Sequence, residues 1–169
     1  MMNQEQNNPL TPQTVEWDDP RAVALRSAMD VEMGIRYAAP EGVPRSAEAM
    51  AKVQAALFVD PADVPATVLV VDQAGRAVAH AALRRLRGEW EVKRVIVDSS
   101  QRGKGVGRTL MLELEAIARR GGATRLILQT GDRQPEAVAL YEKLGYTPIP
   151  TYEPYIEAIP MSLCYEKAL

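Results

Sequence analysis

Residues 89–118 constrain the fold more than any other stretch, because a strand there leads through a glycine-rich turn directly into a helix. A strand is predicted from two alternating faces, with Trp90, Val92 and Ile96 on one and Glu91, Lys93, Val95 and Val97 on the other. Apolar residues then recur at helical spacing over residues 106–118, until Gly121 and Gly122 end the helix. Such a junction directs main-chain N–H groups and the positive end of a helix dipole at one point, which predicts an anion site.

The turn between the strand and the helix adds glycines and cations to this site. Residues 101–108 read QRGKGVGR, so that three glycines alternate with larger residues and three of those residues are cations. Glycines let the backbone approach a ligand closely, and the cations favour a pyrophosphate. The alternative is a turn that only connects the strand to the helix. The coincidence of glycines, cations and a helix start disfavours that alternative.

Two nucleotide-binding motifs fit the turn poorly. A P-loop needs Ser or Thr after its lysine to bind magnesium, whereas Gly105 follows Lys104. A dinucleotide fingerprint needs G-x-G-x-x-G and an acidic residue about 20 residues later. The spacing here is G-x-G-x-G, and the acidic position falls in residues 121–124, which read GGAT.

Composition narrows the class of protein. The 169 residues are 47% hydrophobic and 25% charged, which suits one domain with a sizeable core. The net charge of −2 argues against a nucleic-acid surface, and the basic run at residues 84–87 is interpreted as a solvated strand face. No apolar run approaches the roughly 20 residues of a membrane span, and no signal-peptide pattern opens the chain. We therefore predict no nucleic-acid and no membrane partner.

The chain has one cysteine, Cys164, and one histidine, His80. A single cysteine excludes an internal disulfide, so we expect a cytoplasmic protein. A metal site built on soft ligands would lack ligands, and no metal is predicted.

The remaining elements follow from hydrophobic periodicity and from caps and stops. We expect a disordered tail over residues 1–13 and a single domain over residues 14–169. A short strand near Val15 and Trp17 precedes two helices, at 20–34 and 46–58. The other elements expected are strands at 67–71, 76–86, 125–129, 146–149 and 158–165, and a helix at 135–144.

Residues 102–107, RGKGVG, resemble the R/Q-x-x-G-x-G/A acyl-CoA signature of the GNAT N-acetyltransferase superfamily. Residues 91–97, 130–137 and 140–146 resemble the same family, and the resemblance covers nearly all of residues 14–169. It implies an α/β fold with a mixed, strongly bent sheet of about seven strands and flanking helices, splayed between the fourth and fifth strands. It also implies acetyl-CoA as the co-substrate, lying in the opening.

The resemblance further implies which residues bind the donor. The main chain of Val95, Ile96 and Val97 would pair with the pantetheine arm as if the arm were an added strand. The pyrophosphate would lie on Arg102, Gly103, Lys104, Gly105, Val106, Gly107, Arg108 and Thr109. Many family members carry an asparagine near the start of the later helix, and Gln134 stands in that neighbourhood here.

Two side chains are assigned to proton transfer. Tyr141 matches the family tyrosine near the thioester sulfur, where a phenol with a pKa near 10 can protonate the departing thiolate; packing in the core is the alternative. Glu91 is the candidate base, acting directly, through water or by attracting a cationic amine, because the alternation places it on one face with Val95 and Val97. A solvated strand charge is the competing interpretation. His80 is a distant second choice, since a lone strand histidine is more often a satisfied core residue.

The expected function is therefore acetyl transfer from acetyl-CoA to an amine of a small molecule by direct attack. The alternatives are a non-catalytic acyl-CoA-binding sensor or scaffold, and a nucleotide-binding enzyme. The acceptor pocket is expected around residues 29–37, 50–58 and 152–155. The last strands, with Ile159, Met161 and Leu163, would serve either the core or a homodimer.

Overall fold

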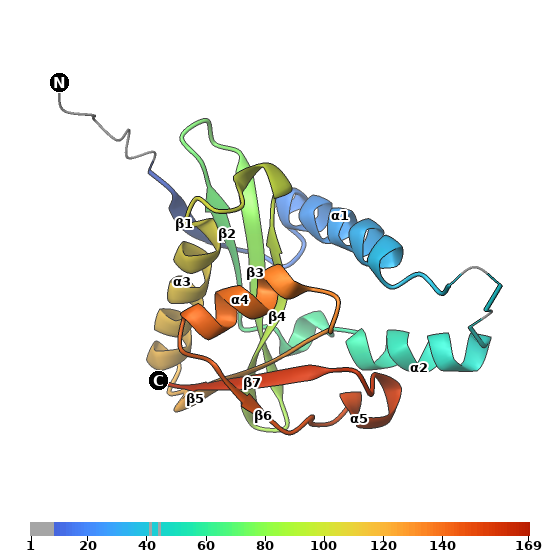
Figure 1. Ribbon diagram of the computed structural model, residues 1–169. Helices are drawn as coiled ribbons and strands as arrows, with labels where there is room; N and C mark the ends of the chain where they lie inside the picture. The colour runs from blue at the N-terminus through green and yellow to red at the C-terminus, as the bar shows by residue number, and fades with distance from the viewer. Residues whose placement is uncertain (1–8, 41, 44) are drawn as a thin grey trace.

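A seven-stranded sheet forms the centre of the computed structural model, which describes residues 9–40, 42–43 and 45–169 (Figure 1). The strands are β1 (Thr11–Val15), β2 (Ala66–Val71), β3 (Ala77–Leu86), β4 (Glu89–Val97), β5 (Arg125–Thr130), β6 (Thr147–Ile149) and β7 (Leu163–Ala168). Their order in the sheet is β1-β2-β3-β4-β5-β7-β6. Every neighbouring pair is antiparallel except β4 and β5, which run parallel. The predicted mixed sheet with flanking helices is confirmed.

In the described part of the chain, five helices accompany the sheet: α1 (Pro20–Arg36), α2 (Ala47–Leu57), α3 (Val106–Arg120), α4 (Pro135–Lys143) and α5 (Tyr155–Ala158). Local caps explain where they begin. The Asp19 carboxylate accepts from the Arg21 amide at 2.9 Å, and the Ser46 hydroxyl accepts from the Ala49 amide at 3.0 Å. Short 3₁₀ turns at Pro61–Asp63 and Ser99–Gln101 lead into β2 and into the glycine-rich turn.

The helices cover the two faces of the sheet unequally. Leu110 and Leu114 of α3 and Tyr141 of α4 belong to one large core with Leu83 and Leu128. On the other face, Ala22 of α1 packs against Leu69 and Val71 in a smaller cluster. Figure 1 shows α3 and α1 on opposite sides of the strands. The face away from α3 thus has a smaller apolar cluster, and the buried polar residues His80, Arg84 and Glu91 lie outside both apolar clusters.

The boundaries differ from expectation in three places. β1 begins at Thr11, inside the predicted tail, and Pro12 is tolerated because β1 is an edge strand; residues 1–8 of that tail lie outside the described residues. α1 continues past Gly34 to Arg36. The strand expected from residue 158 begins at Leu163 instead, since α5 occupies residues 155–158 and Pro160, which lacks an N–H, follows it.

A β-bulge in β4 changes which residues share a face. The two-residue turn Arg87-Gly88, with φ of 49° and 82°, sets the register of β3 against β4. Ala82 pairs with Lys93, but His80 pairs with Ile96, so β4 contains one extra residue between these pairs. Arg94 lies there with a φ of 56°.

The bulge corrects the predicted alternation of β4. Val95 and Val97 pack against the α3 core, whereas Glu91 pairs with Arg84 and projects from the opposite face. The expectation that Glu91 shares a face with Val95 and Val97 is wrong. One inserted residue reverses the side-chain phase of the rest of the strand.

Candidate active site

The sheet opens between β4 and β5. Only two residue pairs join these strands, Glu91 with Ile127 and Val92 with Leu128. Beyond them, Ile96 and Val97 pair with β3 on one side, and no described strand pairs with them on the other. The main chain of residues 95–97 therefore borders the opening, where an extended ligand could pair with it.

The glycine-rich turn follows directly from this open end of β4. Gly103 and Gly105 both have a φ of 78°, which L-residues rarely adopt, and no atom lies within 4 Å of a Cβ built on either. Gly105 is the N-cap of α3 and provides no side-chain cap for its first N–H groups. These groups and the exposed Arg102, Lys104 and Arg108 make the turn suited to a diphosphate.

Gly107 and Thr109 of this segment also have structural contacts. A Cβ at Gly107 would lie 2.9 Å from Cδ2 of Leu140, so Gly107 allows α3 to pack closely against α4. The Thr109 hydroxyl donates to the Gly105 carbonyl at 3.1 Å and thereby stabilises the first turn of the helix.

Tyr141 lies on the same side of the sheet as Val95 and Val97. It is 4% exposed, and its ring packs against Tyr146 and Tyr165 at centroid distances of 6.0 and 6.3 Å. Burial raises the pKa of the Tyr141 phenol well above its usual value. The phenol therefore keeps its proton throughout the neutral range.

Glu91 is fully buried and surrounded by donors. Its Oε1 accepts from Arg84 Nε at 2.9 Å and lies 2.7 Å from Arg84 Nη2. Its Oε2 accepts from the hydroxyls of Tyr152 at 2.6 Å and Tyr155 at 2.9 Å. Glu91 is not a solvated strand charge, and both of its oxygens are engaged.

The cluster around Glu91 also contains Lys93 and Arg84, for which the sequence predicted no role in the site. Lys93 Nζ and Arg84 Nη2 each donate to the Tyr155 hydroxyl at 2.9 Å, and Arg84 also donates to the carbonyl of Phe58. Burial is the main cause that lowers the pKa of Lys93 to about 8, with Glu91 acting in the opposite direction. The interpretation of Arg84 as a solvated residue is wrong, since it is 5% exposed.

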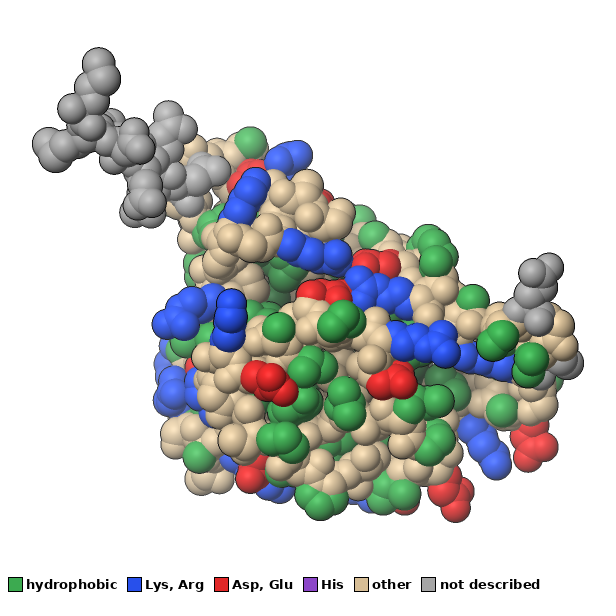
Figure 2. Space-filling model, viewed as in Figure 1, with side chains coloured by type: hydrophobic (Ala, Val, Ile, Leu, Met, Phe, Trp, Pro, Cys, Tyr) green, Lys and Arg blue, Asp and Glu red, His purple; other side chains and the backbone are tan. Residues whose placement is uncertain are grey.

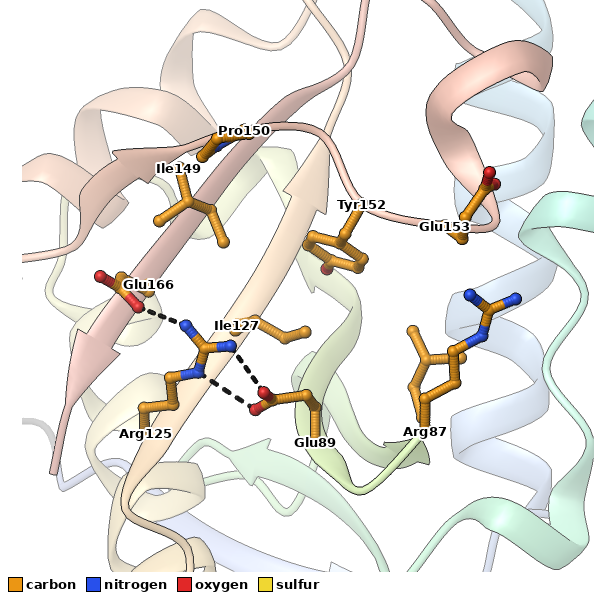
Figure 3. Close-up of a pocket in the computed structure, with 10 residues that line it drawn as sticks. Arg87, Glu89, Arg125, Ile127, Ile149, Pro150, Tyr152, Glu153 and Glu166 are labelled. Carbon is orange, nitrogen blue, oxygen red and sulfur yellow. Dashed lines mark hydrogen bonds and ion pairs between the residues drawn. The ribbon is translucent and has the colours of Figure 1, made fainter.

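A cavity of about 390 Å³ lies on the same face as Glu91, at the end of β4 farthest from the glycine-rich turn. Figure 3 shows the residues that line it. Leu86, Ile127, Ile149 and Tyr152 provide apolar walls. Arg125 donates to Glu89 and Glu166, each at 2.6 Å. Because the Tyr152 hydroxyl donates to Glu91, its ring stands between this cavity and the buried carboxylate.

Ion pairs and the hydrogen bonds of Tyr37 connect the C-terminal end of α1 to the start of α4. Glu32 accepts from Arg102 at 3.2 Å and from Arg36 at 2.7 Å, and Arg36 also pairs with Glu136. Charges of both signs alternate over this part of the surface (Figure 2).

The Tyr37 hydroxyl accepts from the Arg133 amide at 3.0 Å and from the Gln134 side chain at 3.4 Å. Gln134 is the N-cap of α4. Its amide is thus engaged with α1, and a contact with the pantetheine arm remains a prediction.

We expect Gly131→Ala to lower the free energy of unfolding by about 1–3 kcal/mol, because its Cβ would lie 1.9 Å from the Tyr37 hydroxyl oxygen. Denaturant unfolding measures the change. Gly34→Ala is the control, since nothing lies within 4 Å of its Cβ and alanine favours the helix. In a Tyr37→Ala background the cost at Gly131 should largely disappear; an equal cost in both backgrounds contradicts the contact.

Other classes of site are absent from what the structure describes. Within residues 9–40, 42–43 and 45–169, no cluster of three His, Cys, Asp or Glu side chains is placed to hold a metal ion. Over the same ranges, no helix has the length and apolar character needed to cross a bilayer.

Comparisons with known proteins agree with this geometry. The model of the "Acetyltransferase (GNAT) family" matches residues 32–146. The chain is 40% identical over 82 residues to the "IAA acetyltransferase" of Azospirillum brasilense, covering 48% of this chain and 53% of that protein. It is 35% identical over 72 residues to the "Glucosamine 6-phosphate N-acetyltransferase" of Trypanosoma brucei brucei, covering 43% of this chain and 40% of that protein. The chain thus spans about half the length of the curated relatives it matches.

Solved structures share the whole architecture. A candidate acyl-CoA N-acyltransferase of Klebsiella pneumoniae superposes with a TM-score of 0.74 at 28% identity, over 95% of this chain and 97% of that one. A GNAT family acetyltransferase of Elizabethkingia anophelis, solved with acetyl-CoA bound, superposes with a TM-score of 0.65 at 15% identity, over 97% and 100%. The family match over more than half of the chain, on a sheet that opens between β4 and β5, shows that this protein belongs to the GNAT acetyltransferase family.

Proposed function

We propose that the protein transfers an acetyl group from acetyl-CoA to a primary amine of a small molecule by direct attack in a ternary complex. The observation that carries the proposal is the open edge of β4, which leads straight into an uncapped helix start flanked by Arg102, Lys104 and Arg108. The pantetheine arm would pair with residues 95–97, and the pyrophosphate would lie on residues 102–109.

The chemistry then needs an oxyanion site and two proton transfers. The amine nitrogen attacks the thioester carbon, and main-chain N–H groups of β4 stabilise the oxyanion. The C–S bond breaks, and the Tyr141 phenol hydrogen-bonds to the leaving thiolate and gives it a proton, which the phenol regains from solvent before the next turnover. The attacking amine loses its own proton to Glu91, whose Oε2 becomes available when the Tyr152 hydroxyl turns aside.

The cavity beside Tyr152 supports a small acceptor. Its volume of about 390 Å³ falls in the range of small-molecule sites. Three carboxylates and two guanidinium groups line it, so its charge favours a cationic ligand such as an ammonium ion. We place the acceptor here, on the face of β4 that carries Glu91.

A non-catalytic acyl-CoA-binding domain is the second candidate. It is favoured by the hydrogen bonding of Glu91, whose two oxygens are both engaged, since a carboxylate bonded to one guanidinium and two phenols is also found in purely structural clusters.

The cytoplasmic location and a homodimer remain predictions. β7 lies between β5 and β6, so a dimer would use the exposed Met161 and Leu163 side chains or the β6 edge.

Calorimetric titration of acetyl-CoA into the protein, with ATP as a control, tests the donor site. We expect micromolar binding of acetyl-CoA and none of ATP. A panel of primary amines followed by free-thiol release then tests catalysis. Binding without thiol release from any amine would favour the sensor or scaffold, and preferential ATP binding would favour a nucleotide enzyme.

A further inference from the structure

His80 makes a hydrogen bond to the peptide at the β4 bulge. The Arg94 carbonyl is 2.8 Å from His80 Nδ1, in the one part of the β3–β4 ladder where the register shifts. Arg94 has a φ of 56°, an unfavourable conformation for a residue with a side chain. The hydrogen bond between His80 and the Arg94 carbonyl, which is not part of the β-ladder, can therefore stabilise this peptide in its unfavourable conformation.

A chain of further contacts orients the His80 ring. Arg26 Nη1 lies 3.0 Å from His80 Nε2, and Arg26 Nη2 donates to the carbonyl of Trp17 at 2.6 Å. The Arg26 guanidinium also lies over the Trp17 ring, 3.7 Å from its centroid. The Trp17 ring meets His80 edge-on at 6.2 Å. The imidazole, which has no exposed surface, is thus held from α1 and from the segment before it.

The partners of His80 settle its tautomer. Burial, opposed by the bond to the Arg94 carbonyl, lowers the pKa of His80 to about 4, so the ring is neutral near pH 7. A neutral imidazole has one donor and one acceptor nitrogen. Arg26 can only donate, which makes Nε2 the acceptor and Nδ1 the donor to Arg94.

The Arg94 carbonyl and the Val95 N–H belong to the same peptide unit. That unit is planar and trans, so its N–H points opposite to its C=O. With the carbonyl fixed toward the His80 side chain, the Val95 N–H points away from that ring, and no described strand pairs with Val95 beside the opening.

We infer that His80 is a positioning residue for acetyl transfer: by fixing the Arg94–Val95 peptide, it directs the Val95 N–H at the thioester oxygen. The inference rests on the proposed function and adds to it the residue that orients the oxyanion donor. His80 itself does not touch either substrate. Its effect is on the step in which negative charge develops on the carbonyl oxygen.

Two substitutions test the roles of the two ring nitrogens of His80 separately. The side-chain nitrogen of His80→Asn can occupy the Nδ1 position and still donate to Arg94, whereas His80→Gln reaches the Nε2 position and keeps only the contact to Arg26. We expect His80→Asn to retain kcat within about threefold and His80→Gln to lower kcat by roughly ten- to a hundredfold, less than the full loss of an oxyanion donor. The Kd for acetyl-CoA and the KM for the amine should stay within about threefold in both, because the contact acts mainly in the transition state.

Hydrogen exchange of the segment 90–97 provides a readout that does not need turnover. Exchange of the amides paired in the ladder on either side of the bulge should rise in His80→Gln and stay near the wild-type rate in His80→Asn. If His80→Gln does not fold, Arg26→Met is used in its place. This variant keeps His80 but removes the donor to Nε2, so that either ring nitrogen can carry the proton. We expect an intermediate loss of kcat.

The outcomes distinguish this inference from the proposed function. Equal kcat in the Asn and Gln variants, with active wild-type protein, overturns the role of His80 alone. A loss of kcat that only follows a loss of stability in both variants does the same. Wild-type protein that binds acetyl-CoA without turning over any amine overturns the proposed function and this inference with it.

Discussion

Replacement of Tyr141 by phenylalanine is expected to lower kcat for acetyl transfer by about 10²–10⁴-fold, the usual range for loss of general acid catalysis. Burial raises the pKa of the phenol, so its O–H is present at neutral pH and can donate to the sulfur as negative charge develops there. The Kd for acetyl-CoA, measured by calorimetry, should be nearly unchanged, because the ring that packs in the core is retained.

Tyr146→Phe is the matched control for this experiment. Tyr146 belongs to the same core, contacts the Tyr141 ring, and has its pKa raised by burial as well, but its hydroxyl donates to Glu115 at 3.2 Å. We expect it to lose about 0.5–1.5 kcal/mol of stability and to keep kcat. If both variants keep full activity, Tyr141 is a core residue only.

Gly105→Glu should raise the Kd for acetyl-CoA at least about 100-fold, which corresponds to ~2.7 kcal/mol. The new carboxylate would stand where the turn and the helix start present donors to an anion, and would repel the pyrophosphate. Nothing lies within 4 Å of its Cβ, so packing is not disturbed. At Gly107 the same substitution would clash with Leu140 and destabilise the fold, so a loss of acetyl-CoA binding could not be assigned to the binding site alone.

Gly122→Glu controls for backbone strain. Gly122 has a φ of 89°, has no atom within 4 Å of its Cβ, and lies at the other end of α3. Both variants should therefore lose about 1–2 kcal/mol of folding stability, and only Gly105→Glu should lose the donor. Tight acetyl-CoA binding by folded Gly105→Glu protein would show that the glycine-rich turn is not part of the donor site.

The features predicted most accurately have local causes. The Ser46 cap of α2, the glycine-rich turn and the start of α3 depend on residues close together in sequence. The turn at Arg87-Gly88 also has a local cause, and counting back from it pairs Arg84 with Glu91. That pairing could have shown that Arg84 neutralises Glu91 in place of facing solvent.

Nothing in the local sequence marks the bulge at Arg94. Glycine would mark a positive φ, but the residue is arginine, and its conformation is held by contacts to His80 and Asp30 from distant parts of the chain. The alternation read through residues 89–97 therefore failed in the second half of the strand. The face assigned to Glu91 failed with it.

The environment of Glu91 also depends on a distant segment. Tyr152 and Tyr155 reach it from the connection between β6 and β7, which the sequence predicted partly as a strand. A four-residue helix between prolines has too little periodicity to identify. The polar cluster could be recognised only once this connection was placed over the sheet.

The pairing of Arg102 with Glu32 bears on the rates at which the proposed donor would bind and dissociate. Arg102 is partly neutralised by its partner, whereas Lys104 and Arg108 have no ion-pair partner among the described residues. Long-range attraction depends on uncompensated charge and is screened over about 10 Å at 0.1 M salt. If the donor binds this turn as proposed, we expect Lys104 and Arg108 to set its association rate and Arg102, which must exchange a carboxylate for a phosphate, to act after contact. Added salt will slow association more than it speeds dissociation.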